Sequence, residues 1–188
     1  YNGKNVLVVG MGPAGYTLTH YSLRQGFGVI GIDGLKIEPL EPNLTGMPSD
    51  AGHPHHLPTP LKHIDDILMP TDERITVGFG GVSEYGITVR WDKNFLNIIY
   101  LAISRRRNVS IHGGIRFGGT LDLDDAWKLG FHHVAMATGA GKPTFINMEN
   151  NLARGVGKAS DFLMALQLSG AAKKETLVNL QVRLPAAV

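Results

Sequence analysis

Three glycines near the beginning of the chain have the spacing of a phosphate-binding turn. Gly10, Gly12 and Gly15 form the pattern G-x-G-x-x-G directly after the apolar run 5–9. In such a turn the first glycine allows a tight bend, the second lets the backbone approach a pyrophosphate, and the third lets a helix pack closely on a strand. The unpaired N–H groups and the positive dipole end of that helix attract phosphate charge. The segment is therefore predicted to bind the pyrophosphate of a dinucleotide.

An acidic residue follows where this pattern has one. Asp33 ends a second apolar run, close to the distance of about 20 residues that separates such an acid from the glycines. A carboxylate there accepts hydrogen bonds from ribose hydroxyls and repels a 2′-phosphate, so FAD or NAD is expected and NADP is not. The glycine pattern alone is a weak signal, because a glycine-rich turn can also bind nothing. The strand before it, the helix after it and the acid together favour dinucleotide binding.

The residues around these groups predict a strand–helix–strand unit. The apolar runs 5–9 and 28–33 are typical of parallel strands buried on both faces. Residues 13–25 are compatible with a helix, and Gly26 stands where a glycine usually ends one. Four residues are expected near the buried face of this helix: Ala14, Leu18, Tyr21 and Leu23.

Further elements are predicted downstream. Residues 93–107 and 158–169 indicate helices, residues 109–112 and 131–138 indicate strands, and residues 123–129 allow one or two helical turns. Five residues are spaced for the buried face of the helix at 93–107: Phe95, Ile98, Ile99, Ala102 and Ile103.

The succession of these elements predicts the fold class. It is α/β, a three-layer Rossmann-like FAD/NAD(P)-binding fold with a central parallel sheet. A small β-ribbon is expected from 115–117 and 120–123. Residues 34–77 form a long irregular excursion, rich in proline at its start, with one short helix at 61–69. The whole chain, 1–188, is interpreted as the N-terminal part of one domain.

The composition excludes several classes of function. The chain of 188 residues has no cysteine, which removes disulfides, thiolate nucleophiles and cysteine-ligated metals. A net charge of +2 with scattered carriers argues against nucleic acid, and no apolar run approaches the ~20 residues of a membrane span. No secretory leader opens the chain, so a cytoplasmic location is expected. No pattern indicates a metal site or a catalytic acid, base or nucleophile.

Two later motifs lead to a family resemblance. They are Gly-Gly-Val-Ser-Glu-Tyr-Gly-Ile at 80–87 and Met-Ala-Thr-Gly-Ala at 136–140. With the opening glycines, they make the chain resemble the FAD-dependent pyridine nucleotide-disulfide oxidoreductase superfamily, and within it the branch similar to the glutamate synthase small (beta) subunit. The resemblance covers about 1–35 and 78–188. It departs from the usual Gly-Ile-Pro and Leu-Pro-Lys sequences, since this chain has Ile87-Thr88 and Trp91-Asp92-Lys93.

The resemblance implies FAD contacts along the whole chain. The pyrophosphate contacts fall on Gly10, Gly12, Pro13, Ala14 and Gly15. The adenosine ribose contact falls on Asp33, and an adenine-side backbone contact falls near Ile115. Backbone close to the flavin falls on Gly81 and Val82, and a second return to the cofactor falls on Thr138, Gly139 and Ala140.

In that family the protein passes electrons between NAD(P)H and an acceptor through FAD. The resemblance implies that this chain is the FAD-binding portion, that an NAD(P)H domain would follow residue 188, and that the isolated chain is not catalytically complete. It also implies an iron–sulfur protein or domain as the electron acceptor. Two other functions fit the first motif: a free-standing NAD-dependent dehydrogenase, and a non-catalytic module that uses the nucleotide or the fold to dock a partner.

Overall fold

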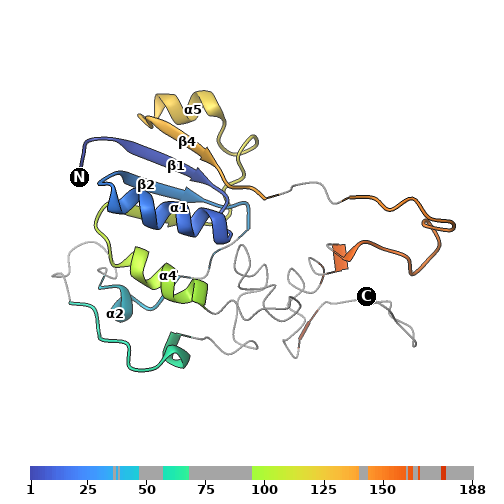
Figure 1. Cartoon of the computed structure of the whole chain (residues 1–188), viewed down its shortest axis with the longest axis horizontal. Coiled ribbons are helices and arrows are strands. Elements are labelled where there is room, and N and C mark those ends of the chain that lie inside the picture. Colours follow the sequence, from blue (N-terminus) through green and yellow to red (C-terminus); the bar gives the residue numbers. More distant parts are fainter. Residues whose placement is uncertain are drawn as a thin grey trace.

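A parallel β-sheet with helices on both faces makes up the core of the protein (Figure 1). The computed structural model describes residues 1–35, 37, 39–46, 57–67, 95–139, 144–159, 161–162, 165 and 175–176. Most of the helix expected at 158–169 therefore lies outside the described residues. No helix in the described ranges is long and apolar enough to cross a membrane.

Four parallel strands form the sheet in the order β3-β2-β1-β4. They are β1 (Asn5–Val9), β2 (Gly28–Ile32), β3 (Val109–His112) and β4 (His133–Met136). After β1 the chain adds β2 and β3 on one side and then returns to add β4 on the other. This is the beginning of the classic doubly wound order, and it places the topological switch point between β1 and β4. The α/β fold is consistent with a Rossmann-like architecture.

The helices that follow these strands are short. The structure contains α1 (Pro13–Arg24), α2 (Pro42–Thr45), the 3-10 helix η1 (Ile64–Ile67), α4 (Phe95–Ser104) and α5 (Leu123–Lys128). Helices α1 and α4 lie side by side (Figure 1), and the rings of Tyr16 and Tyr100 meet between them at 5.6 Å between centroids. A proline at the start of α1 and Gly26, with φ of +86°, after its end are the signals that bound this helix.

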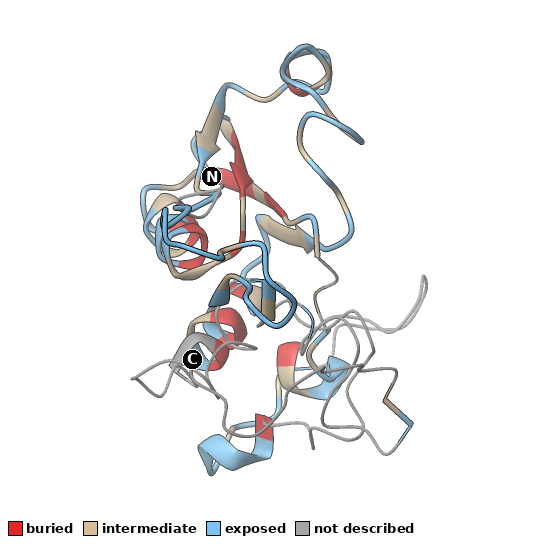
Figure 2. Cartoon of the chain, turned by 90° about the vertical axis from the view of Figure 1, so that its right-hand side faces the viewer, coloured by how far each residue is buried: buried red, intermediate tan, exposed pale blue. Residues whose placement is uncertain are grey.

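Residues of β1 alternate between two hydrophobic clusters, one on each face of the sheet. Val6 and Val8 join the cluster under α1 and α4, whereas Leu7 and Val9 join the cluster that contains Ala126 of α5. Figure 2 shows buried residues along the central strand and on the helix faces next to it. Strand β1 is therefore paired on both sides and covered on both faces, so its carboxyl end is held by the core.

A capping box starts α5 on the second face. The carboxylate of Asp122 accepts a hydrogen bond from the Asp125 N–H at 2.8 Å, and the Asp125 carboxylate accepts one from the Asp122 N–H at 3.3 Å. This bond from Asp125 lowers the pKa of the Asp122 carboxyl. The cap stops the chain from continuing extended and turns Ala126 into the core.

The predicted strands and the helices predicted at 13–25, 93–107 and 123–129 are confirmed. The predicted buried faces of the first two helices are right only in part: Leu23, Ile99 and Ile103 pack in the core as expected, but other residues do not. In α1 the buried residues are Gly15, Tyr16, Thr19 and Leu23, while Ala14, Leu18 and Tyr21 are exposed. In α4 the buried residues include Asn97, Tyr100, Leu101 and Ile103, while Ile98 and Ala102 are exposed. The number of apolar residues on one side of α1 does not determine which side is buried. The close contact of Gly15 with the preceding turn orients α1, and α4 packs against the side of α1 that carries Tyr16.

The expected β-ribbon reduces to one isolated bridge between Phe117 and Leu121. Gly118 has φ of +84° and donates its N–H to the Leu121 carbonyl at 2.7 Å. A left-handed glycine closes the chain into a tight turn at this place, so the two arms are too short to form a ladder.

Arg105 ties together two described pieces of the excursion at 34–77. Its Nε donates to the Leu44 carbonyl and its Nη2 donates to the Thr59 carbonyl, both at 2.8 Å. The side chain therefore bridges the end of α4 to α2 and to residues 57–60.

Substitution of two leucines by alanine tests the two faces of β1 and α1. Leu7 lies in the central strand and is 1% exposed. The substitution Leu7→Ala should lower the free energy of unfolding by about 3 kcal/mol, because the packed surroundings cannot move in to fill the cavity that it leaves. Leu18→Ala on the exposed side of α1 should cost less than about 1 kcal/mol. Urea denaturation at 25 °C measures both values, and equal losses would contradict the assigned faces.

Candidate functional site

The carboxyl ends of β1, β2 and β4 meet at one edge of the sheet, where α1 begins. Gly10 follows β1, Asp33 follows β2, and residues 137–139 follow β4. In open parallel sheets, ligands bind outside the carboxyl ends of the strands at the switch point. The predicted residues from both halves of the sequence therefore converge where this architecture binds ligands.

Gly10 is held between the two neighbouring strands. Its N–H donates to the Ile32 carbonyl at 2.8 Å, and its φ is +97°. A Cβ at this position would lie 2.5 Å from the carbonyl oxygen of Ala137 and 3.1 Å from the Cα of Thr138. Only glycine fits here, for reasons of both conformation and space. The turn after β1 and the end of β4 thus contact each other directly.

Gly15 brings the helix onto this turn. A Cβ on Gly15 would overlap the carbonyl oxygen of Gly10. Without a side chain at Gly15, the first turn of α1 rests on the backbone of Gly10. The glycine roles predicted for Gly10 and Gly15, a tight bend and a close helix contact, match this geometry.

Gly12 is the N-cap of α1 and differs from the other two glycines. A Cβ on Gly12 would meet nothing within 4 Å, and its φ of −80° suits any residue. No side chain caps the helix, and the Tyr16 N–H is the first to bond back, to the Gly12 carbonyl at 3.0 Å. Within the described residues, the N–H groups of Gly12, Ala14 and Gly15 have no hydrogen-bond partner.

Unpaired N–H groups at a helix N-terminus attract negative charge. Such groups are satisfied by side chains, by water or by ligands, and here no side chain takes them. Pro13, the first residue of α1, has no N–H to contribute, and no acidic residue lies in the first helical turn. A helix of 12 residues therefore presents its positive end to the open space beside Gly12.

Asp33 lies half-buried next to the turn. Its Oδ2 accepts the Met11 N–H at 2.8 Å, and its Oδ1 accepts the Leu35 N–H at 2.9 Å. A carboxylate has about four acceptor positions, so two remain for hydroxyl donors. The backbone of Asp33 is also fixed, because its N–H donates to the His112 carbonyl at 3.0 Å.

The other predicted contact residues are distributed around this edge. Ile115 lies beside Asp33, and its N–H donates to the Asp33 carbonyl at 2.9 Å. Because this N–H is already bonded, an adenine contact at Ile115 would use the carbonyl of Ile115. Thr138 is exposed next to Gly10, and Gly139 has φ of +73° with open space around its Cα. Gly81, Val82 and Ala140 lie outside the described residues.

Met11 and Gly31 belong to the site, and sequence analysis missed them. The Met11 side chain is fully buried against Gly31 of β2, and its N–H holds Asp33. A glycine in the middle of a buried strand indicates that another group approaches closely. Gly31, inside the apolar run 28–33, was the signal that could have found this contact.

The ionisable groups beneath the turn stay neutral. Burial raises the pKa of the Tyr16 phenol far above its ordinary value, and the neighbouring Tyr100 and the charge of Asp33 add to the rise. Burial also raises the pKa of Tyr100, against a hydrogen bond with the Leu40 backbone. Neither phenol can serve as a base near neutral pH. The described residues contain no group of three or more His, Asp or Glu that could hold a metal ion.

Asp33→Asn tests the two backbone hydrogen bonds of the carboxylate. An amide offers one oxygen in place of two, so one of the N–H donors of Met11 and Leu35 faces an NH₂ group. We expect a loss of about 1–3 kcal/mol in unfolding free energy, measured by urea denaturation. Asp124→Asn, in the first turn of α5, makes the same change on the surface and should stay within about 0.5 kcal/mol of the wild type. An equal effect of both substitutions would show that Asp33 does not fix the turn.

One relative matches almost the whole chain. Over 184 residues the chain is 45% identical to a protein of Rickettsia prowazekii (strain Madrid E) that bears the name Uncharacterized protein RP006. The match takes in 98% of this chain and 24% of that protein, so the chain spans about a quarter of the relative's length. No family model matches the chain. Since the relative's name states no ligand or reaction, a function has to come from the chemistry of the site.

Proposed function

We propose that the chain binds the ADP part of FAD and is the FAD-binding portion of a flavin-dependent NAD(P)H oxidoreductase. The observation that carries the proposal is the N-terminus of α1. Three N–H groups there have no hydrogen-bond partner among the described residues, and a Cβ on Gly12 would meet nothing within 4 Å, at the switch point of a parallel sheet. This arrangement supports the binding of a pyrophosphate.

The donors and acceptors at the site match the parts of an ADP group in order. The N–H groups of Gly12, Ala14 and Gly15 suit the two phosphates, and the free acceptor positions of Asp33 suit the ribose hydroxyls. The negative charge of Asp33 disfavours a ribose that carries a 2′-phosphate. The motifs at 80–87 and 136–140 extend the proposal from a dinucleotide in general to FAD.

The part of the chain in this function is to bind and to orient. Gly10 and Gly15 fix the height of α1 above the turn, and Asp33 fixes the ribose end. FAD, when bound, supplies hydride and single-electron transfer. The site contributes positioning, because fixed N–H groups and a fixed carboxylate need no rearrangement when the cofactor enters.

Electron transfer needs more than these residues. We propose NAD(P)H as the donor, bound by a further domain of the parent protein, and an iron–sulfur protein or domain as the acceptor. The relative is about four times as long as the matched region, which leaves ample sequence for such domains in a protein of this kind.

The direct test is the binding of three nucleotides to the purified chain. FAD, NAD and NADP are titrated separately by isothermal calorimetry at low salt, and FAD binding is checked by quenching of flavin fluorescence. We expect FAD to bind, and NADP to bind at least about tenfold more weakly than NAD because of Asp33. Binding of NAD without FAD would favour a free-standing NAD-dependent dehydrogenase. Absence of binding to all three would favour a docking module and would reject the proposal.

Gly12→Val tests the pyrophosphate site without disturbing the fold. The new side chain points into open space and the backbone suits it, so the melting temperature should stay within a few degrees of the wild type. The same side chain occupies the place of a phosphate, so affinity for the dinucleotide should fall about a hundredfold or more.

A matched control is Gly157→Val, which also adds a side chain in open space with no left-handed backbone. It should leave both affinity and stability unchanged. If Gly12→Val binds as tightly as this control, the pyrophosphate does not lie at the N-terminus of α1.

A further inference from the structure

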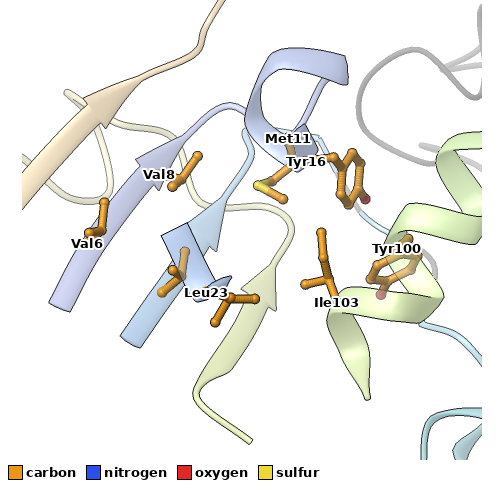
Figure 3. Packing of buried hydrophobic residues seen from close by; sticks show 8 residues of the cluster. Val6, Val8, Met11, Tyr16, Leu23, Tyr100 and Ile103 are labelled. Carbon is orange, nitrogen blue, oxygen red and sulfur yellow. The ribbon is translucent and has the colours of Figure 1, made fainter. Parts of the chain in front are cut away.

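The side chain of Met11 fills a space that two glycines leave open. Met11 has no exposed surface, and a Cβ added to Gly31 would lie 2.5 Å from its sulfur and 3.1 Å from its Cε. A Cβ on Gly15 would lie 3.6 Å from the same sulfur. Figure 3 shows Met11 among the buried residues of this cluster, near Tyr16. The thioether thus lies between β2 and the first turn of α1, in contact range of both backbones.

The backbone of Met11 makes a second attachment to β2. Its N–H donates to Oδ2 of Asp33, the residue directly after the strand. One residue therefore binds the strand through its side chain at Gly31 and the end of the strand through its N–H. Both contacts are made by Met11, which lies between Gly10 and Gly12 at the centre of the turn.

A turn built on glycine needs such attachments. Glycine has more accessible backbone conformations than any other residue, so Gly10 and Gly12 alone would leave the turn free to move. Binding then has to supply the free energy of ordering the turn, whereas a turn already fixed by buried contacts does not. The alignment of several N–H groups on one pyrophosphate depends on sub-ångström placement of this backbone.

We propose that Met11 and Gly31 form a positioning pair, which sets the height of the glycine turn above β2 and holds the Asp33 carboxylate in its ribose-facing orientation. The pair rests on the proposed dinucleotide site. It goes beyond that site because Met11 stands at a variable position of the glycine pattern and Gly31 stands outside the pattern. Neither residue touches the ligand, and both act through the backbone of residues 10–12 and the carboxylate of Asp33.

The test compares two glycine-to-alanine substitutions in the same strand. Gly31→Ala forces the new Cβ against the Met11 sulfur and lifts the turn. Gly28→Ala forces a Cβ against the side chains of Asn5 and Tyr1, at the opposite end of β2 from the site. Both overfill a tight contact and should lower the melting temperature. Only the first should weaken binding of the dinucleotide, by about tenfold in Kd, because only the first moves the turn.

A second set of variants relieves the clash. In Met11→Ala/Gly31→Ala the shortened side chain makes room for the new Cβ, so the double variant should bind more tightly than Gly31→Ala alone. If the two residues affected binding independently of each other, their effects would add and the double variant would bind more weakly than Gly31→Ala. Met11→Leu keeps the buried volume and should change Kd by less than about twofold.

The measurements are Kd by calorimetry, well below the melting temperature of every variant, and the melting temperature itself. A tenfold loss of dinucleotide affinity in Gly31→Ala, with the affinity of Gly28→Ala unchanged, supports the positioning pair. Equal affinities of these two variants, or a double variant that binds more weakly than Gly31→Ala, overturn it. If Gly31→Ala does not fold, Met11→Ala decides: a severalfold weaker Kd supports the pair and an unchanged Kd overturns it. Wild-type protein that binds no dinucleotide rejects the proposed function itself, which is measured before any variant and is thus distinct from failure of the pair alone.

Discussion

The contact of Gly15 with the carbonyl of Gly10 determines the arrangement around the site. A single added carbon at Gly15 would overlap that carbonyl oxygen, so α1 lies as close to the preceding turn as two backbones allow. This closeness decides which side of α1 meets the sheet, and it buries Tyr16 and Thr19 rather than Leu18 and Tyr21. It also places the first N–H groups of the helix at the edge of the sheet, where β1 and β4 separate.

The Asp33 carboxylate stabilises the backbone at this edge of the sheet and also has acceptor positions that remain open. Its two oxygens accept N–H groups from Met11 and Leu35, and these bonds fix the carboxylate plane before any ligand enters. The negative charge also lies beside the positive end of α1, which favours the folded arrangement. The same carboxylate therefore serves the fold through two of its acceptor positions and leaves the others for a ligand. Any change at Asp33 alters both, so its effect on binding has to be judged against its effect on unfolding.

Sequence patterns predicted the elements well because each element depends on neighbouring residues. The apolar runs of β1 and β2, the glycine directly after β1 and the capping acid before α5 act locally, and all these elements form where expected. The faces of α1 and α4 also depend on contacts that the spacing of apolar residues does not show, such as Gly15 with Gly10 and Tyr16 with Tyr100, so the periodicity predicted only part of each buried face. The bridge between Phe117 and Leu121 replaced a ribbon for a similar reason, since the backbone conformation of Gly118 is not visible in apolar spacing.

Sequence patterns also predicted some residues of the candidate site and missed others. The glycine spacing predicted the turn, and the spacing of Asp33 from these glycines predicted that an acid would lie beside it, because both are placed at fixed distances along the chain. The role of Met11 was invisible, since its side chain meets Gly31 across the fold.

The ionisable side chains buried beneath the turn are held in their neutral form. Tyr16 and Tyr100 are the ionisable side chains in the cluster under the glycine turn, and burial keeps both protonated. Asp33 has its oxygens engaged by backbone N–H groups. Neither phenol can act as a base near neutral pH, and the Asp33 carboxylate fixes the backbone of Met11 and Leu35. The backbone around the turn is thereby held in one position, which is what the proposed binding of a dinucleotide requires.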